Sequence, residues 1–308
     1  MKPPFEARAV TKRFGDKTAL DRLTLSLPPE SVIGLVGRNG SGKSTLIRTI
    51  TGLSLPDQGT AMTFGRPVAE LAEPELSRIG AVFQTSHHLG WMTVGAQLEF
   101  AAAYHRHWDL SRQERLMEVL ELHPSERVGT LSPGNAQKLA VLLAICPRPD
   151  LLLLDEPVSA LDPIAREELL TFLLELVRED DTTILISSHV LVDIERVVDR
   201  VVCLERGSVV HDSSLDALLE GYAEWHITAP EGIRLDGIEA GGAFDWLVEV
   251  DQRGRQARLL VRTGAEGDAR RAALAGAHGL DPLRDIHTRA VNLERLFPHL
   301  VGRPGGGQ

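Results

Sequence analysis

The feature that most constrains the fold is a run of eight residues, Gly37-Arg38-Asn39-Gly40-Ser41-Gly42-Lys43-Ser44, which fills every fixed position of the pattern G-x-x-x-x-G-K-[ST]. Residues 31–36 before it predict a buried strand, and residues 45–50 after it predict the first turns of a helix. Glycines in such a loop let successive backbone N–H groups turn inward, and the helix N-terminus adds partial positive charge. The sequence therefore predicts a phosphate-binding loop, in which Lys43 reaches the β- and γ-phosphates of a nucleotide and Ser44 holds Mg²⁺. A Gly-rich turn with a chance lysine is the alternative, and the flanking strand and helix disfavour it.

A second pattern is the apolar run from Leu151 to Leu154, which ends in Asp155 and Glu156. An apolar strand that ends in Asp places one carboxylate beside the Mg²⁺ of a phosphate loop on the same sheet. Glu156 can then face the γ-phosphate and act as the base for an attacking water. An ordinary strand end with an acidic turn is the alternative, and the pairing with a phosphate loop favours the catalytic interpretation.

A third pattern is Leu131-Ser132-Pro133-Gly134-Asn135-Ala136-Gln137. Ser132 can cap a helix whose first residue is Pro133, which is a favoured arrangement at helix starts. One interpretation is therefore a well-capped helix and nothing more. The other is a second helix N-terminus aimed at a γ-phosphate, with the Ser132 hydroxyl and the Gly134 N–H as donors.

Composition and charge narrow the class of protein. The chain has 308 residues, 43% hydrophobic and 25% charged, as expected for a globular protein with one large or two medium domains. Its net charge of −10 opposes a role in coating nucleic acid, so no nucleic-acid partner is expected. Cys146 and Cys203, in apolar surroundings, indicate a reducing compartment. The N-terminus lacks the apolar stretch of a signal peptide and no run has the length of a membrane span, so we expect a cytoplasmic chain.

The order of predicted elements indicates an α/β fold with two domains. Residues 5–10 and 23–27 predict short strands on either side of a loop with Phe14 and Gly15. Predicted strands alternate with predicted helices up to residue 220, which favours a mostly parallel sheet covered by helices, in a domain of residues 1–220. Residues 88–147 interrupt this rhythm and predict an inserted helical subdomain, in which residues 94–122 have helical spacing.

After Gly221 the pattern changes. Residues 244–251 and 257–262 alternate between apolar and polar and predict a hairpin joined by Gln252-Arg253-Gly254. Residues 266–278 and 292–300 predict helices. We expect a small C-terminal α+β domain of residues 222–302 and a disordered tail of residues 303–308.

Taken together, these patterns resemble the ATP-binding-cassette (ABC) ATPase family over residues 5–220. Besides the three patterns above, Gln84 after a strand, Ser159-Ala160-Leu161-Asp162 and Ser187-Ser188-His189 stand in the order of that family. The resemblance implies a P-loop NTPase with a RecA-like core and an inserted helical subdomain. The chain departs from the family at Pro133 and Asn135, where glycine and glutamine are usual, and Pro133 removes one backbone donor.

The resemblance also implies a role for four further residues. It implies that Phe14 stacks on adenine, that Gln84 senses Mg²⁺ and water and relays to membrane subunits, that Asp162 crosses a dimer interface, and that His189 touches the γ-phosphate and positions water. Each residue also has a structural alternative. Phe14 could belong to the core, Gln84 could be a solvated amide in a loop, and His189 could be a packed core histidine. Asp162 could cap the helix that begins at Pro163, either instead of crossing a dimer interface or as well as doing so.

The expected site residues fall into three sets. The catalytic set is Glu156, His189, Gln84 and Lys43. The Mg²⁺ set is Ser44, Gln84 and Asp155. The ATP-binding set is Phe14, Gly37, Arg38, Asn39, Gly40, Ser41, Gly42, Lys43, Ser44, Thr45, Ser132, Gly134 and Asp162.

The implied activity is ATP hydrolysis in a head-to-tail homodimer that energises transport through separate integral membrane permease subunits. This would place the chain peripherally on the inner face of the cell membrane. Three segments are similar to segments of bacterial drug, antibiotic and peptide exporters, which favours export. They are residues 104–109, residues 187–196 and Leu293-Glu294-Arg295-Leu296-Phe297. An importer ATPase and a cytosolic ABC ATPase that acts on ribosomes or DNA are the alternatives.

Two further alternatives concern the nucleotide and the tail. A small P-loop GTPase is disfavoured because the chain lacks an Asn-Lys-x-Asp motif. Residues 222–308 either bind a regulator or partner, or support packing or the dimer.

Overall fold

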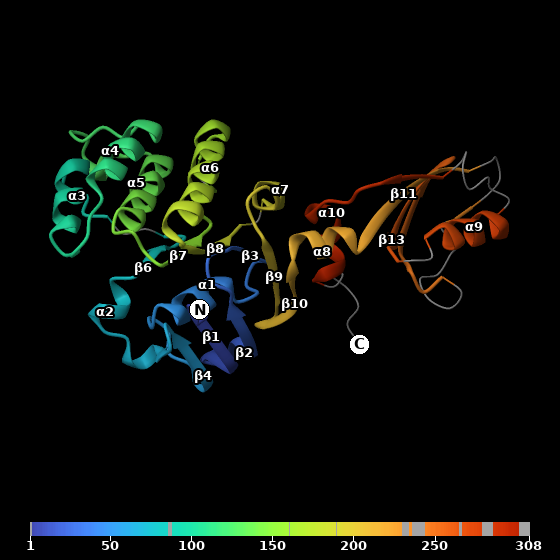
Figure 1. Cartoon of the computed structure of the whole chain (residues 1–308), viewed down its shortest axis with the longest axis horizontal. Coiled ribbons are helices and arrows are strands. Elements are labelled where there is room, and N and C mark those ends of the chain that lie inside the picture. The colour runs from blue at the N-terminus through green and yellow to red at the C-terminus, as the bar shows by residue number, and fades with distance from the viewer. Residues whose placement is uncertain are drawn as a thin grey trace. The chain divides into compact units, whose positions relative to one another are not determined.

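The fold is that of a computed structural model, which describes residues 2–85, 88–159, 161–188, 190–229, 234–235, 244–264, 267–278 and 286–301 (Figure 1). The chain divides into two units, Met1–Asp212 and Ser213–Gln308, and each is described by itself. The division falls before the expected boundary at residues 220–222, because helix α8 (Leu215–Glu220) contacts strand β11 (Tyr222–Thr228). The expected tail at residues 303–308 lies outside the described residues.

A six-stranded sheet forms the centre of the first unit. Its order is β10-β9-β3-β8-β7-β6. β3 pairs in parallel with β8 and β9, and β7 pairs in parallel with β6 and β8. Every residue of β3, β7 and β8 is buried, which explains why their sequences are continuous rather than alternating apolar runs. The bounds are β3 Val32–Gly37, β6 Ile79–Val82, β7 Leu151–Asp155, β8 Thr183–Ser187, β9 Arg200–Glu205 and β10 Ser208–Ser214.

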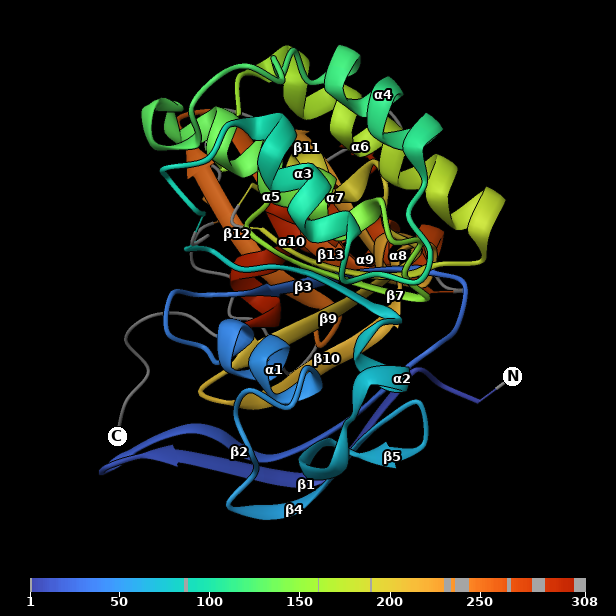
Figure 2. The same ribbon diagram turned by 90° about the vertical axis from the view of Figure 1, so that its left-hand side faces the viewer.

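A second, antiparallel sheet lies across helix α1 (Lys43–Ile50) from the central one (Figure 2). Its order is β2-β1-β4-β5. The buried side chains of α1, Leu46, Ile47 and Ile50, join one apolar core with residues of both sheets. The bounds are β1 Phe5–Phe14, β2 Lys17–Leu27, β4 Gln58–Thr63 and β5 Arg66–Pro67.

The β1–β2 hairpin is longer than the sequence predicts. Strands were expected over residues 5–10 and 23–27 with Phe14 in a loop, but both strands extend until Phe14 pairs with Lys17. The turn between them contains Gly15 at a φ of +57°, a conformation that favours glycine. Phe14 therefore ends a strand, which fixes the direction of its side chain.

Helices cover the other face of the central sheet. The stretch of residues 94–122 that the sequence predicts to be helical contains two helices, α3 (Val94–Ala102) and α4 (Leu110–Val119). Asp109 starts α4 by accepting a hydrogen bond from the backbone N–H of Arg112, as an N-cap does. The remaining helical segments of this unit are η1 Val68–Glu70, α2 Glu73–Leu76, η2 Val128–Thr130, α5 Pro133–Ile145, α6 Pro163–Asp180 and α7 Leu191–Glu195.

A buried ionic network joins the start of α4 to the end of α6. Arg112 has a side chain only 8% exposed, and its Nη2 lies 2.5 Å from Asp180 Oδ2. Arg148 binds Asp109 at 2.8 Å and closes the network. Because the side chains of Arg112, Asp109 and Asp180 are only 8–13% exposed, removing Arg112 leaves two carboxylates without their buried partner.

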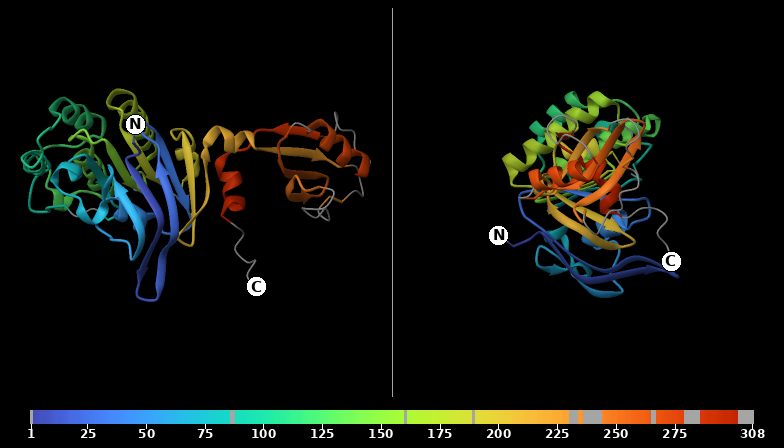
Figure 3. Two further views of the ribbon diagram at one scale, coloured as in Figure 1. Left: turned by 60° about the horizontal axis from the view of Figure 1, so that its bottom comes forward. Right: turned by 90° about the vertical axis from the view of Figure 1, so that its right-hand side faces the viewer.

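The second unit is a four-stranded antiparallel sheet with helices. Its order is β12-β13-β11-β14, and the predicted hairpin is confirmed by the pairing of β12 (Leu247–Arg253) with β13 (Gln256–Arg262). One face of the sheet packs Trp225 and Leu259 against Leu274 of helix α9. The ribbon shows this helix lying against the sheet (Figure 3). The remaining elements are β14 Ile286–Arg289, α9 Gly267–His278 and α10 Leu293–Leu300.

Helix α10 is held by charge as well as by apolar packing. Leu293 and Leu296 are fully buried. Arg295 binds Glu224 of β11 at 2.8 Å and Glu249 of β12 at 2.5 Å. The Leu-Glu-Arg-Leu-Phe segment therefore packs α10 within its own unit. Among the described residues, no helix is both long and apolar enough to cross a membrane.

We expect Arg112→Met to destabilise the junction of α4 and α6 by about 3 kcal/mol, because Asp180 and Asp109 lose their buried partner. Hydrogen exchange of the α4 and α6 amides measures this local stability. Glu175→Gln is the matched control, because the Arg115–Glu175 pair joins the same two helices but is more exposed, at 54% and 35%, and about 0.5 kcal/mol is expected there. Equal effects of the two substitutions would contradict the assignment.

Candidate nucleotide-binding site

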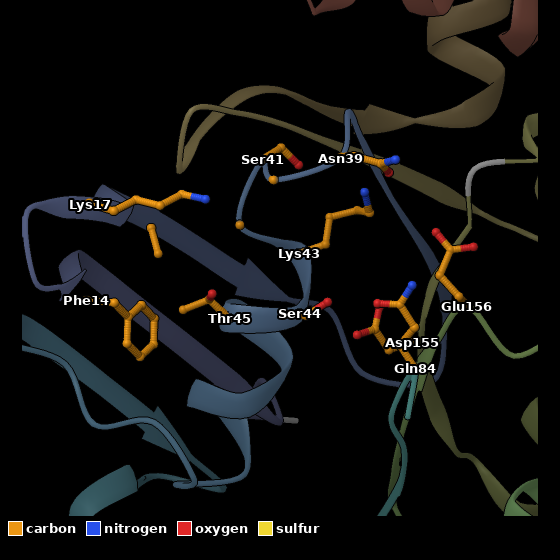
Figure 4. A pocket seen from close by; sticks show the side chains of 13 residues that line it. Phe14, Lys17, Asn39, Ser41, Lys43, Ser44, Thr45, Gln84, Asp155 and Glu156 are labelled. Atoms are coloured by element: carbon orange, nitrogen blue, oxygen red, sulfur yellow. The ribbon is translucent and has the colours of Figure 1, made fainter. Parts of the chain in front are cut away.

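The carboxyl ends of β3 and β7 border a cavity of about 300 Å³. This is the edge where ligands bind in open parallel sheets. Three parts of the first unit supply its walls: the β1–β2 hairpin, the loop before α1, and the segments that follow β6 and β7 (Figure 4). The lining residues are Phe14, Lys17, Ala19, Asn39, Gly40, Ser41, Gly42, Lys43, Ser44, Thr45, Gln84, Asp155 and Glu156.

The backbone of the loop before α1 requires glycine. Gly40 and Gly42 have φ values of +78° and +111°, and Gly42 is the N-cap of α1. A Cβ atom on Gly42 would lie 2.6 Å from the Ala19 carbonyl oxygen, and one on Gly37 would lie 2.5 Å from the Leu204 carbonyl oxygen. Ser41 Oγ is buried and has no hydrogen-bond partner among the described residues, so the loop retains an unused polar atom at the cavity. This arrangement fits a phosphate ligand.

Lys43 is the buried cation of the site. Its Nζ donates to the carbonyl oxygens of Gly37 at 2.7 Å and Arg38 at 3.3 Å. Burial lowers the pKa of Lys43 below its ordinary value, while the negative charges of Glu156 and Asp155 act in the opposite direction. Gly37 and Arg38 do not line the cavity, and their part in the site is to hold this ammonium group.

Ser187 fixes the two acidic residues. The Ser187 hydroxyl donates to Asp155 Oδ1 at 2.7 Å and accepts from the Glu156 backbone N–H at 3.0 Å. Glu156 has a φ of +57°, a sparsely populated conformation for a residue with a side chain. Asp155 and Glu156 are 2% and 8% exposed. The two carboxylates therefore sit at one end of the cavity on a rigid support.

Three predicted residues lie away from the cavity. Ser132 caps α5 by accepting from the Asn135 N–H at 3.1 Å. Asp162 caps α6 by accepting hydrogen bonds at Oδ1 from the backbone N–H groups of Ile164 and Ala165. The hydrogen bond from the Ala165 N–H is the largest of the causes that lower the pKa of Asp162. Gly134 lies in the first turn of α5. Both Ser132 and Asp162 therefore act as helix N-caps, as the structural alternative for each residue predicts. His189 lies outside the described residues.

Sequence reasoning missed three residues. Lys17 and Ala19 line the cavity because they lie at the start of β2, where Lys17 pairs with Phe14, and the sequence predicts a shorter hairpin. Ser187 was noted only within a longer motif. Its role follows from strand register, since it pairs directly with Asp155 across β7 and β8.

The residues expected to hold Mg²⁺ offer one hydroxyl, one amide and one carboxylate. Ser44, Gln84 and Asp155 line the same cavity. No cluster of three or more His, Cys, Asp and Glu side chains suited to a metal occurs in the part of the chain that the structure describes. This donor set fits Mg²⁺, which proteins commonly bind through one or two carboxylates together with the phosphates of a substrate.

Comparison with known proteins gives the family. A family model described as ABC transporter matches residues 20–159. The bacitracin transport ATP-binding protein BcrA of Enterococcus faecalis is 34% identical over 215 residues, which cover 69% of this chain and 70% of that protein. The chain belongs to the ABC transporter family. It is an ATP-binding subunit of that family and an ATPase.

Other relatives of this ABC subunit differ in the direction of transport that their names state, since some are named for export and others for import. The Nod factor export ATP-binding protein I of Burkholderia lata is 32% identical over 311 residues, with 97% of each chain covered. The methionine import ATP-binding protein MetN of Corynebacterium glutamicum is 33% identical, with 68% of this chain and 62% of that protein covered.

A solved structure shares the cassette fold. It is a dimeric ATP-binding cassette in a post-hydrolysis state with ADP and Pi. It is 25% identical, with a TM-score of 0.62 over 68% of this chain and 98% of its own. The expected fold, a P-loop NTPase core with an inserted helical subdomain, is confirmed.

We expect Ser187→Ala to lower ATP hydrolysis at least tenfold and to cost about 1–3 kcal/mol in stability, because a buried carboxylate loses its hydroxyl donor. Steady-state ATPase rates and urea unfolding measure both effects. Thr183→Ala is the matched control, because Thr183 Oγ1 also accepts one backbone hydrogen bond but lies at the other end of β8. If both variants keep the wild-type rate, Ser187 does not support the carboxylates.

Proposed function

We propose that two copies of this chain hydrolyse ATP at sites shared between them, and that hydrolysis energises export through separate integral membrane subunits. The observation that carries this proposal is the separation of the site into two parts. One part is the cavity with the phosphate loop, Asp155 and Glu156. The other part, Ser132 and Asp162, lies exposed at the starts of α5 and α6.

The exposed part suits a contact with a second copy. Ile164, next to the cap of α6, is 72% exposed although it is apolar. Pro133 occupies the first position of α5, where its missing N–H costs little, and Gly134 keeps its donor. A second copy placed head to tail would bring the α5 N-terminus to the γ-phosphate bound in the first copy's cavity.

The proposed chemistry is an in-line displacement. The oxygen of a water attacks the γ-phosphorus, the bond from phosphorus to the β–γ bridging oxygen breaks, and ADP leaves. Glu156 accepts the proton of the water, and Lys43 stabilises charge on the β- and γ-phosphates. We propose that Gln84 and His189 orient the water and that Phe14 stacks on adenine. Bound Mg²⁺, held by Ser44, Gln84 and Asp155, would supply further charge stabilisation.

We expect Glu156→Gln to bind ATP and form a stable dimer while it hydrolyses ATP at less than about 1% of the wild-type rate, because the proton acceptor is gone. Light scattering after size-exclusion chromatography with ATP and Mg²⁺ measures the dimer. Adding Ser132→Tyr should abolish it, whereas Ser125→Tyr, on an exposed serine of the same subdomain, should not. A strictly monomeric Glu156→Gln protein would refute the shared site.

A groove beside Gln84 supports the proposed membrane partner. It has a volume of about 390 Å³, and Phe83 and Thr85, which flank Gln84, line it together with Leu143 and Pro147. Near the same subdomain surface, Trp91 and Tyr104 are 72% and 76% exposed. Apolar patches of this kind mark interaction sites, and a permease segment is the partner that the family provides.

We expect a photo-crosslinking amino acid at Tyr104 to capture an integral membrane protein with several spans when the chain is extracted from its own cells. Mass spectrometry of the adduct identifies the partner. The same probe at Leu53, which is 69% exposed on another part of the unit, is the control. Adducts with ribosomal proteins alone would favour the cytosolic alternative instead.

Export is supported by the extent of similarity. The export relative covers 97% of this chain, including the second unit, whereas the import relative covers 68%. We therefore propose export, with the chain bound peripherally to the cytoplasmic face of the membrane through its partner.

A further inference from the structure

Two segments leave the acidic end of the site and enter different helices. The first follows Glu156, whose carbonyl oxygen accepts from Ser159 Oγ at 3.0 Å, and leads to Asp162 at the start of α6. The second follows Ser187, continues through Ser188, whose Oγ accepts from the Val190 N–H at 2.9 Å, and leads to α7.

One side chain connects these two segments. Arg166 of α6 lies 2.9 Å through Nη1 from Asp193 Oδ2 of α7. Its Nη2 is 3.5 Å from the carbonyl oxygen of Leu161, the residue before Asp162. Arg166 and Asp193 are 25% and 18% exposed at their side chains, so water screens the pair only in part.

We propose that Arg166 is a positioning residue for ATP hydrolysis, which holds Leu161 and the start of α6 against α7. This inference rests on the proposed function of the site. Two kinds of link connect Arg166 to the carboxylate support. Hydrogen bonds join Ser159 to Glu156, Arg166 to Leu161 and to Asp193, and Val190 to Ser188, and the chain itself joins Ser188 to Ser187. Ser187 then binds the backbone N–H of Glu156.

Arginine is suited to this task because its planar guanidinium donates in two fixed directions at once. A lysine would offer one point charge and could not hold a carbonyl and a carboxylate with the same geometry. Neither Arg166 nor Asp193 lines the nucleotide cavity. Arg166 therefore acts on the placement of Glu156 and Asp162, and leaves nucleotide binding by one copy intact.

The chain contains a matched control pair between the same two helices. Arg196, at the end of α7, lies 3.4 Å from Glu167 of α6, and both side chains are more than half exposed, at 64% and 67%. Glu167 directly follows Arg166 in the sequence, and among the described residues no hydrogen bond joins this pair to Leu161, Ser159 or Ser188. Exposed pairs of this kind contribute little.

The experiment compares Arg166→Met with Arg196→Met in the full-length protein. We expect Arg166→Met to lower kcat at least tenfold, with the Kd for the ATP analogue ATPγS within twofold of wild type. Arg196→Met should keep both values within twofold. Arg166→Lys should recover only part of kcat. A kcat unchanged in Arg166→Met, or a matching loss in Arg196→Met, overturns the proposal.

A double-mutant cycle covers the case in which Arg166→Met does not fold. Asp193→Asn keeps the size of the side chain and should lower kcat at least threefold on its own. The double variant with Asp193→Asn and Arg166→Lys should show a smaller fold-loss of kcat than the product of the two single fold-losses. This is expected because both substitutions act on the same contact between Arg166 and Asp193. Multiplicative effects would overturn the proposal. A wild-type protein that does not hydrolyse ATP would instead refute the proposed function itself.

Discussion

The register between two buried parallel strands determines where the charged groups of this molecule lie. β7 and β8 pair so that Asp155 stands opposite Ser187, and β3 lies next to β8 with Leu35 opposite the same serine. A shift of one residue would move every side chain of a strand to the opposite face, so it would separate Ser187 from Asp155 and leave a buried carboxylate without its donor. The phosphate loop, the carboxylates and the serine that supports them meet at one edge for this reason.

The sequence predicts those parts of the site that are local in the chain. The loop from Gly37 to Ser44, the strand that ends in Asp155, and the caps at Ser132 and Asp162 each depend on neighbouring residues, and the structure has each element where it was expected. Lys17 and Ser187 were missed because their positions depend on strand pairing. The same limit applies to the predicted helix over 94–122, where the break follows from the side-chain cap of Asp109 and its buried contacts with Arg148 and Arg112.

Capping a helix and contacting a partner are compatible at Ser132 and Asp162. A serine hydroxyl that accepts one hydrogen bond can still donate its proton, so the cap of α5 leaves the Ser132 O–H available to an oxygen of a phosphate. At Asp162 both cap hydrogen bonds end on Oδ1, so the cap does not use Oδ2. The caps also fix the two side chains before any partner arrives, which reduces the entropy lost on association. The structural and the functional interpretation of these residues therefore support each other.

The charges that line the cavity sum to zero. Lys17 and Lys43 stand against Asp155 and Glu156, so these side chains alone do not attract a triphosphate. The attraction must come largely from groups that carry no formal charge, namely the N–H groups of the loop and the N-terminus of α1, and the proposed Mg²⁺ would add positive charge to theirs. Gly40 and Gly42 hold those N–H groups in place through backbone angles that other residues adopt at a cost. The two carboxylates that weaken the attraction are the groups to which we assign the metal and the proton in the proposed function, so the loop geometry would offset the electrostatic cost of that chemistry.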